Sequence, residues 1–345
     1  GAGPLAPRLL IAGSFQSAGA VVANNVVSFD PSGETWSTLG GGTNSQVLAL
    51  AALPDGDLIA GGSFTQAGGV NADRIARYSP AANTWSALGS GTNGPVRAVA
   101  RMPNGDLIVA GSFTVAGGVP TNSIARFSPA TNAWSALANG TNNDVYALTA
   151  LPDGSLIAGG SFTMAGGIAA RQVARYFPAT DSWQPLGTGT NGVVRALLTL
   201  ANGDVIVAGR FTTAGSATAN SIARYSPATN AWQGIPSGMH GTVFSLALRP
   251  DGDVIVGGDV VTATGNPASS IARFSPTTNT WSPLGNGPDS TVFAVALLPS
   301  GDVVAGGGFV SVGGAAIRQV ARYAEVTDAW SPLVDGSNGG VFALA

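Results

Sequence analysis

The chain has 345 residues, only 10% of which are charged, and a formal net charge of −3. All fifteen basic residues are arginines that form no run, so the sequence lacks the clustered positive charge that nucleic-acid binding requires. The absence of cysteine excludes disulfides and thiolate chemistry, and no stretch approaches the roughly 18 apolar residues of a membrane helix, so we expect no membrane insertion.

Seven tryptophans divide the chain into equal repeats, each tryptophan lying 49 residues after the previous one. They are Trp36, Trp85, Trp134, Trp183, Trp232, Trp281 and Trp330. A fixed period of this length, without insertion or deletion, is typical of a repeat architecture in which each unit packs against its neighbours. We therefore predict a single domain over residues 1–345.

The second repeat shows the elements expected in each unit. Apolar runs at Val47–Leu53, Leu58–Phe64, Arg74–Ser79 and Thr84–Leu88 predict four strands separated by turn residues. The first turn, Pro54–Asp57, contains an Asp-Gly pair, which favours a tight hairpin because both positions adopt positive φ. The first two strands are apolar on both faces, which indicates burial between neighbouring units. Four antiparallel strands repeated radially predict an all-β, seven-bladed β-propeller.

The two ends of the chain predict how the ring closes. Arg8–Leu10 match Asp57–Ile59, so the chain begins at a second strand. Val341–Ala345 match Val292–Ala296, so the chain stops within a first strand. We expect this C-terminal strand to become the inner strand of the first blade, which leaves no unpaired strand edge.

The repeat tryptophans are predicted to be core residues. The second strand ends in Gly61-Gly62, and two adjacent glycines in a strand indicate a bulky neighbour or a close approach of two backbones. We expect the neighbour to be the repeat tryptophan, whose burial removes roughly 150–250 Å² from water.

One pattern recurs along the chain: an apolar run is followed by a Gly-Gly pair, then by a Tyr, and then by a Trp seven positions after the Tyr. Examples are Tyr78 with Trp85 and Tyr176 with Trp183. This pattern resembles the kelch repeat over essentially the whole chain. The segment GSFTxAGG, between the second and third strands, is similar to repeats in bacterial surface proteins and in fungal cortical cell-polarity markers. The resemblance implies a propeller, a fold that serves enzymes, adaptors and adhesins alike, and so implies no single function.

Catalytic and metal-binding patterns are sparse. Copper radical oxidases resembling galactose oxidase need a cysteine, two tyrosines and two histidines, whereas this chain has no cysteine and only His240. A lone loop histidine is typical of a solvent-facing residue rather than of a catalytic triad. The Asp-Gly-Asp turns supply too few oxygens for calcium. We therefore predict no catalytic residue, no metal site and no cofactor.

A recurring arginine in the third strand invites comparison with an anion-binding array. A single central ligand cannot use six equivalent positions at the periphery, so we expect these arginines to be structural, either bonding to backbone carbonyls or pairing with the aspartates of the first turn. Blade one has Ser28 in place of the arginine and Arg8 in place of the aspartate, so both members of the expected pair are absent from that blade. The six arginines are Arg77, Arg126, Arg175, Arg224, Arg273 and Arg322.

The ligand site is predicted on the face that carries the loops from the fourth to the first strand and from the second to the third. The second residue of each first strand varies strongly, while its neighbours are almost always Ala, Val or Leu. Around the ring this position is Leu48, Arg97, Tyr146, Arg195, Phe244, Phe293 and Phe342. The nearby loop residues Asp144, His240 and Asp289 also break the repeat pattern.

Arginines beside aromatic rings suit a peptide, a sugar or an acidic group, and we expect these residues to lie at the mouth of the channel. We predict a non-enzymatic binding module of an extracellular or cell-envelope protein, with a protein, peptide or glycan as its partner. Two alternatives stay open. One is an enzyme that acts on a glycan or small molecule through Arg97, Tyr146, Arg195 and Asp144. The other is a structural spacer whose variable side chains merely plug the channel.

Overall fold

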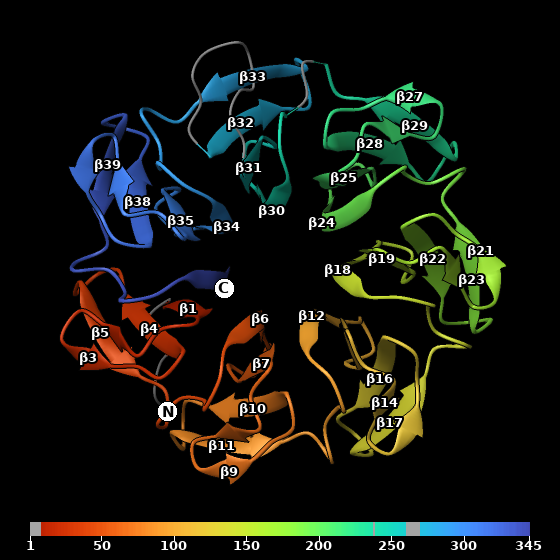
Figure 1. The fold of residues 1–345 in the computed structure, drawn as a ribbon, viewed down its shortest axis with the longest axis horizontal. Coiled ribbons are helices and arrows are strands. Elements are labelled where there is room, and N and C mark those ends of the chain that lie inside the picture. Colours follow the sequence, from red (N-terminus) through yellow and green to blue (C-terminus); the bar gives the residue numbers. More distant parts are fainter. Residues whose placement is uncertain (1–7, 237–238, 260–269) are drawn as a thin grey trace.

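The computed structural model describes residues 8–236, 239–259 and 270–345, which form a ring of blades around a central opening (Figure 1). These residues contain seven four-stranded antiparallel sheets and no helix. In each sheet the first strand lies beside the opening and the fourth lies at the rim. The predicted all-β, seven-bladed propeller is confirmed.

The strands of each blade follow one another from the opening outward. The inner strands are β40 (Val341–Leu344), β6 (Val47–Ala52), β12 (Val96–Arg101), β18 (Val145–Ala150), β24 (Val193–Thr199), β30 (Val243–Leu248) and β34 (Val292–Leu297). The second strands are β1 (Leu9–Gly13), β7 (Leu58–Gly62), β13 (Leu107–Gly111), β19 (Leu156–Gly160), β25 (Val205–Arg210), β31 (Val254–Gly258) and β35 (Val303–Gly307). The third strands are β4 (Val26–Asp30), β10 (Ile75–Ser79), β16 (Ile124–Ser128), β22 (Val173–Phe177), β28 (Ile222–Ser226), β32 (Ile271–Ser275) and β38 (Val320–Ala324). The outer strands are β5 (Thr35–Thr38), β11 (Thr84–Ala87), β17 (Ala133–Ala136), β23 (Ser182–Pro185), β29 (Ala231–Gly234), β33 (Thr280–Pro283) and β39 (Ala329–Pro332).

The ring closes as the sequence predicts, with β40 as the inner strand of the blade that begins at the N-terminus. Its sheet has the order β40-β1-β4-β5. Ile11 lies opposite Leu344, and the backbone N–H of Leu10 donates to the carbonyl of Ala345 at 2.8 Å. The blade next to the chain ends therefore has the same four strands as the others.

Short two-stranded hairpins, which the sequence did not predict, lie between the second and third strands. In the described residues they are β2 (Ser17–Ala18) with β3 (Val21–Val22), β8 (Gln66–Ala67) with β9 (Val70–Asn71), β14 (Val115–Ala116) with β15 (Val119–Pro120), β20 (Met164–Ala165) with β21 (Ile168–Ala169), β26 (Thr213–Ala214) with β27 (Ala217–Thr218), and β36 (Ser311–Val312) with β37 (Ala315–Ala316). Thr43, in the loop from β5 to β6, forms a bridge with Ala67 of β8. Both loop sets therefore lie on one face, the loop face, opposite the turn face that carries the Asp-Gly turns.

The core lies between blades and not in one central cluster. Between blades three and four, for example, Ile108 and Leu137 pack with Leu156, Phe162 and Trp183. The second strands are buried along their whole length, as in β7 and β19. This explains why these strands are apolar on both faces, because each lies between two neighbouring sheets.

The repeat tryptophans lie on the outer strands, where each indole faces the preceding blade. The Nε1–H of Trp85 donates to the carbonyl of Leu39 at 2.8 Å, and its ring lies 5.1 Å from that of Tyr78. The expectation that the indole packs on Gly61-Gly62 is wrong, because that pair lies two strands further in. A Cβ added at Gly68 would meet Trp85 at 2.6 Å, so the glycine of the loop-face hairpin is the one that makes room for the indole.

The third-strand arginines pair with turn aspartates, as predicted. Arg77 Nε lies 2.5 Å from Asp57, and Arg224 Nε lies 2.7 Å from Asp204. Burial acts to raise the pKa of Asp204. The hydrogen bond from Arg224, together with those from other side chains, nevertheless holds this pKa below its ordinary value. These contacts on the turn face fasten the third strand to the first turn and leave no common anion site.

The tryptophan contacts give a matched comparison. The Nε1–H of Trp232 donates to Leu186 O at 2.9 Å, whereas the buried Nε1 of Trp36 has no hydrogen-bond partner among the described residues. Both indoles are partly buried beside another ring. Trp232→Phe should therefore lower the free energy of unfolding by about 1 kcal/mol more than Trp36→Phe, since only the former loses a hydrogen bond. Urea unfolding of the two variants measures this difference, and equal losses would contradict it.

Candidate functional site

Every inner strand contains a β-bulge at the variable position. In blade four, Val145 lies opposite Gly160 and Ala147 opposite Gly159, which leaves Tyr146 as an extra residue without a partner. The same shift in register occurs in the other six blades. A bulge turns the extra residue out of the regular ladder and is common beside binding sites. The seven variable side chains are therefore presented by one repeated backbone device.

A glycine at the end of the second strand permits this bulge. A Cβ added at Gly160 would lie only 2.0 Å from the backbone oxygen of Asp144, and one added at Gly209 would lie 2.1 Å from that of Val193. A side chain at either position would therefore collide with the strand that carries the bulge. The glycine pair marks a close approach of two backbones, which was one of its two predicted meanings.

The variable side chains form a belt, which here denotes Arg97, Tyr146, Arg195, Phe244, Phe293 and Phe342. All six are partly exposed, although the inner-strand residue before each of them is buried. Their strands surround the central opening (Figure 1). The belt therefore lies at the loop-face end of the inner strands, around the centre of the ring. The role of these residues in binding a ligand stays a prediction.

One side of the belt is cationic. Tyr146 lies between two arginines, with the guanidinium carbon of Arg195 4.2 Å and that of Arg97 5.3 Å from the centre of its ring. Both distances are within the range of cation–π attraction. Arg97 Nε also donates to Ser112 Oγ at 3.0 Å, which fixes its direction.

The other side of the belt is an apolar arc of three phenylalanines. The rings of Phe244 and Phe293 lie 5.4 Å apart, and so do those of Phe293 and Phe342. Both pairs meet edge to face, which is a favoured geometry for aromatic rings. Arg195 lies 5.9 Å from the ring of Phe244 and so joins the two sides.

Asp144 lies within the cationic side of the belt, two residues before Tyr146. It accepts a hydrogen bond from the Tyr146 hydroxyl at 3.2 Å, and one of its oxygens lies 4.0 Å from Arg97 Nε. The structure therefore brings together four of the residues that were predicted from the sequence. In this arrangement Asp144 binds the hydroxyl of Tyr146 and places a negative charge near Arg97.

Asp289 lies at a repeated loop position where five other blades have asparagine. Its carboxylate accepts hydrogen bonds from the backbone N–H groups of Val310 and Ser311, which tie the loop before β34 to the hairpin of β36. Asn44 makes the same two contacts in blade two. Burial acts to raise the pKa of Asp289, but these N–H donors hold it below its ordinary value. Asp289 thus has a structural contact that the sequence did not reveal.

His240 has the same repeat position in blade six, where it is exposed. It lines a hollow of about 440 Å³ on the loop face, together with Arg210 and Met239. Arg210 replaces the serine that precedes Phe in blades one to four, and it lies opposite Val193, two residues before Arg195 of the belt. Arg210 was not among the residues predicted from the sequence, although it breaks the GSFT pattern visibly.

The described residues include no group of three or more His, Asp or Glu side chains placed to hold a metal ion. The same part of the chain has no helix of the length and apolarity needed to cross a membrane.

A family model described as the Rax2 C-terminal beta propeller domain matches the chain at residues 37–152, 135–235 and 198–295. The three overlapping matches extend from residue 37 to residue 295, which is most of the chain. Rax2 is a fungal cortical polarity marker, so the predicted resemblance to repeats of such markers is confirmed. The kelch assignment stays a prediction. No curated protein matches the chain.

The Asp289 contacts give a testable consequence for stability. Asp289→Ala should lower the free energy of unfolding by about 1 kcal/mol, because two backbone N–H groups lose their acceptor. Asp289→Asn should preserve it, since asparagine makes the same contacts in blade two. A lowered pKa in the folded state means that the carboxylate contributes stability above its ordinary pKa and loses it as the pH falls. Thermal unfolding from pH 7 to pH 3 should therefore show a weaker pH dependence for Asp289→Asn than for the parent protein, and an unchanged dependence would contradict this role.

Proposed function

The chain belongs to the family of Rax2 C-terminal beta propeller domains, and on this premise we propose that it is a non-enzymatic binding module of a protein at the cell surface or cortex. Its ligand is a peptide segment of another protein that carries a carboxylate beside apolar side chains. The low proportion of charged residues, 10%, together with many Ser, Thr and Asn, supports a location in the cell envelope or outside the cell.

The observation that carries this proposal is the lack of an ion pair at Arg195 within the described residues. Within residues 8–236, 239–259 and 270–345, no carboxylate forms an ion pair with Arg195, although the recurring arginines of the turn face pair with aspartates. Arg195 lies over the ring of Tyr146 and is partly exposed beside the opening. A guanidinium in this position offers donors in a planar fork that suits a carboxylate.

The phenylalanine arc supports an apolar contact next to that carboxylate. Three partly exposed rings from successive blades form one continuous surface around the opening. Aromatic rings are enriched in protein interfaces because they offer a large contact area with little loss of conformational entropy. A peptide with an apolar side chain near an acidic one would place the first on Phe293 and the second on Arg195.

The contacts of Asp144 favour binding over catalysis. A general acid or base must be free to exchange a proton with its substrate. Asp144 instead accepts a hydrogen bond from Tyr146 and lies close to Arg97, so its contacts are those of a residue that positions its neighbours. The belt then acts as a preformed surface with one cationic and one apolar side.

A screen on peptide and glycan arrays tests the proposal. The parent protein should select peptides that combine an acidic residue with an aromatic or aliphatic one. The double variant Arg97→Ala/Arg195→Ala should weaken binding of a selected peptide at least about tenfold, since charge-assisted hydrogen bonds contribute roughly 1.5–3 kcal/mol each. Isothermal titration calorimetry measures the change in Kd.

The matched control is Arg101→Ala, because Arg101 is exposed at the opposite end of the strand that carries Arg97. It should bind the selected peptide as the parent does. Three results would contradict the proposal: equal binding by the double variant, equal loss in Arg101→Ala, or selection of ligands without an acidic group.

A further inference from the structure

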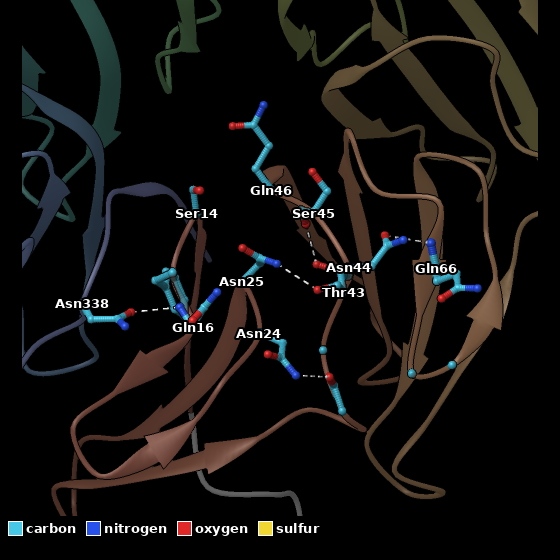
Figure 2. Close-up of a pocket in the computed structure, with 15 residues that line it drawn as sticks. Ser14, Gln16, Asn24, Asn25, Thr43, Asn44, Ser45, Gln46, Gln66 and Asn338 are labelled. Atoms are coloured by element: carbon cyan, nitrogen blue, oxygen red, sulfur yellow. Dashed lines mark hydrogen bonds between the residues drawn. The ribbon is translucent and has the colours of Figure 1, made fainter.

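A second, chemically different hollow lies on the loop face between blades one and two. Its volume is about 780 Å³, compared with about 440 Å³ between blades five and six and about 310 Å³ between blades three and four. Figure 2 shows Asn24 and Asn25 on the side of blade one, and Asn44 and Gln66 on the side of blade two. The hollow falls within the ordinary range of small-ligand sites, roughly 300–1,000 Å³.

The hollow is polar but uncharged. The described residues that line it are mainly amides, hydroxyls and glycines, and none of them is an Asp, Glu, Arg or His. The hollow between blades five and six differs, because Arg210 and His240 line it. An ionic ligand would find no opposite charge between blades one and two, so the lining favours a neutral ligand.

Two asparagines of the hollow use their NH₂ groups for contacts with the protein backbone. Asn25 Nδ2 donates to Thr43 O at 2.8 Å, and Asn24 Nδ2 donates to Gly41 O at 3.0 Å. Within the described residues, the side-chain oxygens of both asparagines have no hydrogen-bond partner. These two acceptors are fixed in direction because their own NH₂ groups are anchored.

A donor is fixed in the same way at the far side. Asn338 Oδ1 accepts from the backbone N–H groups of Gln16 and Ser17 at 2.8 and 3.0 Å, so its NH₂ group is turned away from that contact. The hollow therefore offers both anchored acceptors and an anchored donor. Hydroxyl groups can donate and accept at once, so a polyhydroxylated molecule satisfies such a lining.

Blade two has a longer side chain at the equivalent place between blades two and three. Arg74 has the repeat position of Asn25, and its Nη1 donates to Thr92 O at 3.0 Å, which is the counterpart of the contact from Asn25 to Thr43 O. The guanidinium also lies 3.6 Å from Asp73. The short asparagine keeps the backbone contact and leaves free the space that an arginine would occupy.

We propose that the hollow between blades one and two is a binding site for a neutral oligosaccharide. The anchored amide oxygens of Asn24 and Asn25 accept hydrogen bonds from sugar hydroxyls, and the NH₂ group of Asn338 donates one. This site is separate from the belt and does not rest on the function proposed for it. The chain would then hold a peptide at the channel mouth and a glycan beside it.

The fold itself supplies the test variant. Asn25→Arg reproduces the arrangement around Arg74, and both positions have similar backbone conformations, with φ of 71° and 65°. The variant should therefore fold and should fill the hollow. Titration calorimetry with maltotriose, mannotriose and N,N′,N″-triacetylchitotriose should detect binding of at least one of them by the parent protein, and Asn25→Arg should weaken that binding at least about tenfold.

The matched control is Ser123→Arg, which places an arginine at the same repeat position between blades three and four, where φ is 67°. It should bind the trisaccharide as the parent does, and so should Arg97→Ala/Arg195→Ala. Should Asn25→Arg lower the melting temperature markedly, Gln46→Met removes an amide from the same hollow with little change in volume and should also weaken binding.

Five outcomes would overturn the proposal. The first four are no binding of any of the three trisaccharides at millimolar concentration, undiminished binding by both Asn25→Arg and Gln46→Met, equal loss of binding in Ser123→Arg, and tighter binding of an anionic saccharide such as a galacturonate trimer. Loss in the belt double variant alone would place the saccharide at the channel mouth and would also overturn it.

Discussion

The close approach of two backbones at the end of each second strand is the constraint on which the candidate site depends. In blade four, only a residue without a side chain can lie where Gly160 meets the carbonyl of Asp144. The adjoining bulge leaves Tyr146 outside the hydrogen-bonded ladder. Because every blade repeats this register shift, one position per repeat determines the chemistry of the channel mouth.

The contacts that recur in most blades include ion pairs on the turn face, whereas the residues that differ between blades gather on the loop face. On the turn face, pairs such as Arg224 and Asp204 recur and hold the strands together. On the loop face, the contact of Asn44 with the neighbouring hairpin recurs in other blades, while the belt and the position of Asn25 vary between blades. A variable side chain on a constant backbone is how a repeat protein gains a specific site without disturbing its core. The cationic side, the apolar arc and the uncharged hollow are three results of such variation.

The 49-residue period predicted the seven blades, and the register of the two chain ends predicted the closing strand. The loss of both partners in blade one, with Arg8 beside Ser28, pointed correctly to the arginine–aspartate pairs. The neighbour of Trp85 could not be predicted, because each repeat has several glycines and spacing does not say which one lies beside the indole. The bulge and the Asp289 contacts depend on pairing between strands and loops. The hollow depends on which side chains the loops of two neighbouring blades bring together.

The candidate site depends most directly on the belt, so the contacts of Phe293 are its sharpest test. Its ring lies 5.4 Å from the rings of Phe244 and Phe342, which belong to different blades. Nuclear Overhauser effects, measured in protein labelled selectively at phenylalanine, report which protons lie near this ring. If the three rings form one arc, Phe293 should show cross-peaks to both other rings. Cross-peaks that instead connect Phe293 to buried inter-blade residues such as Ile255 would show that the bulge does not direct this position to the channel mouth.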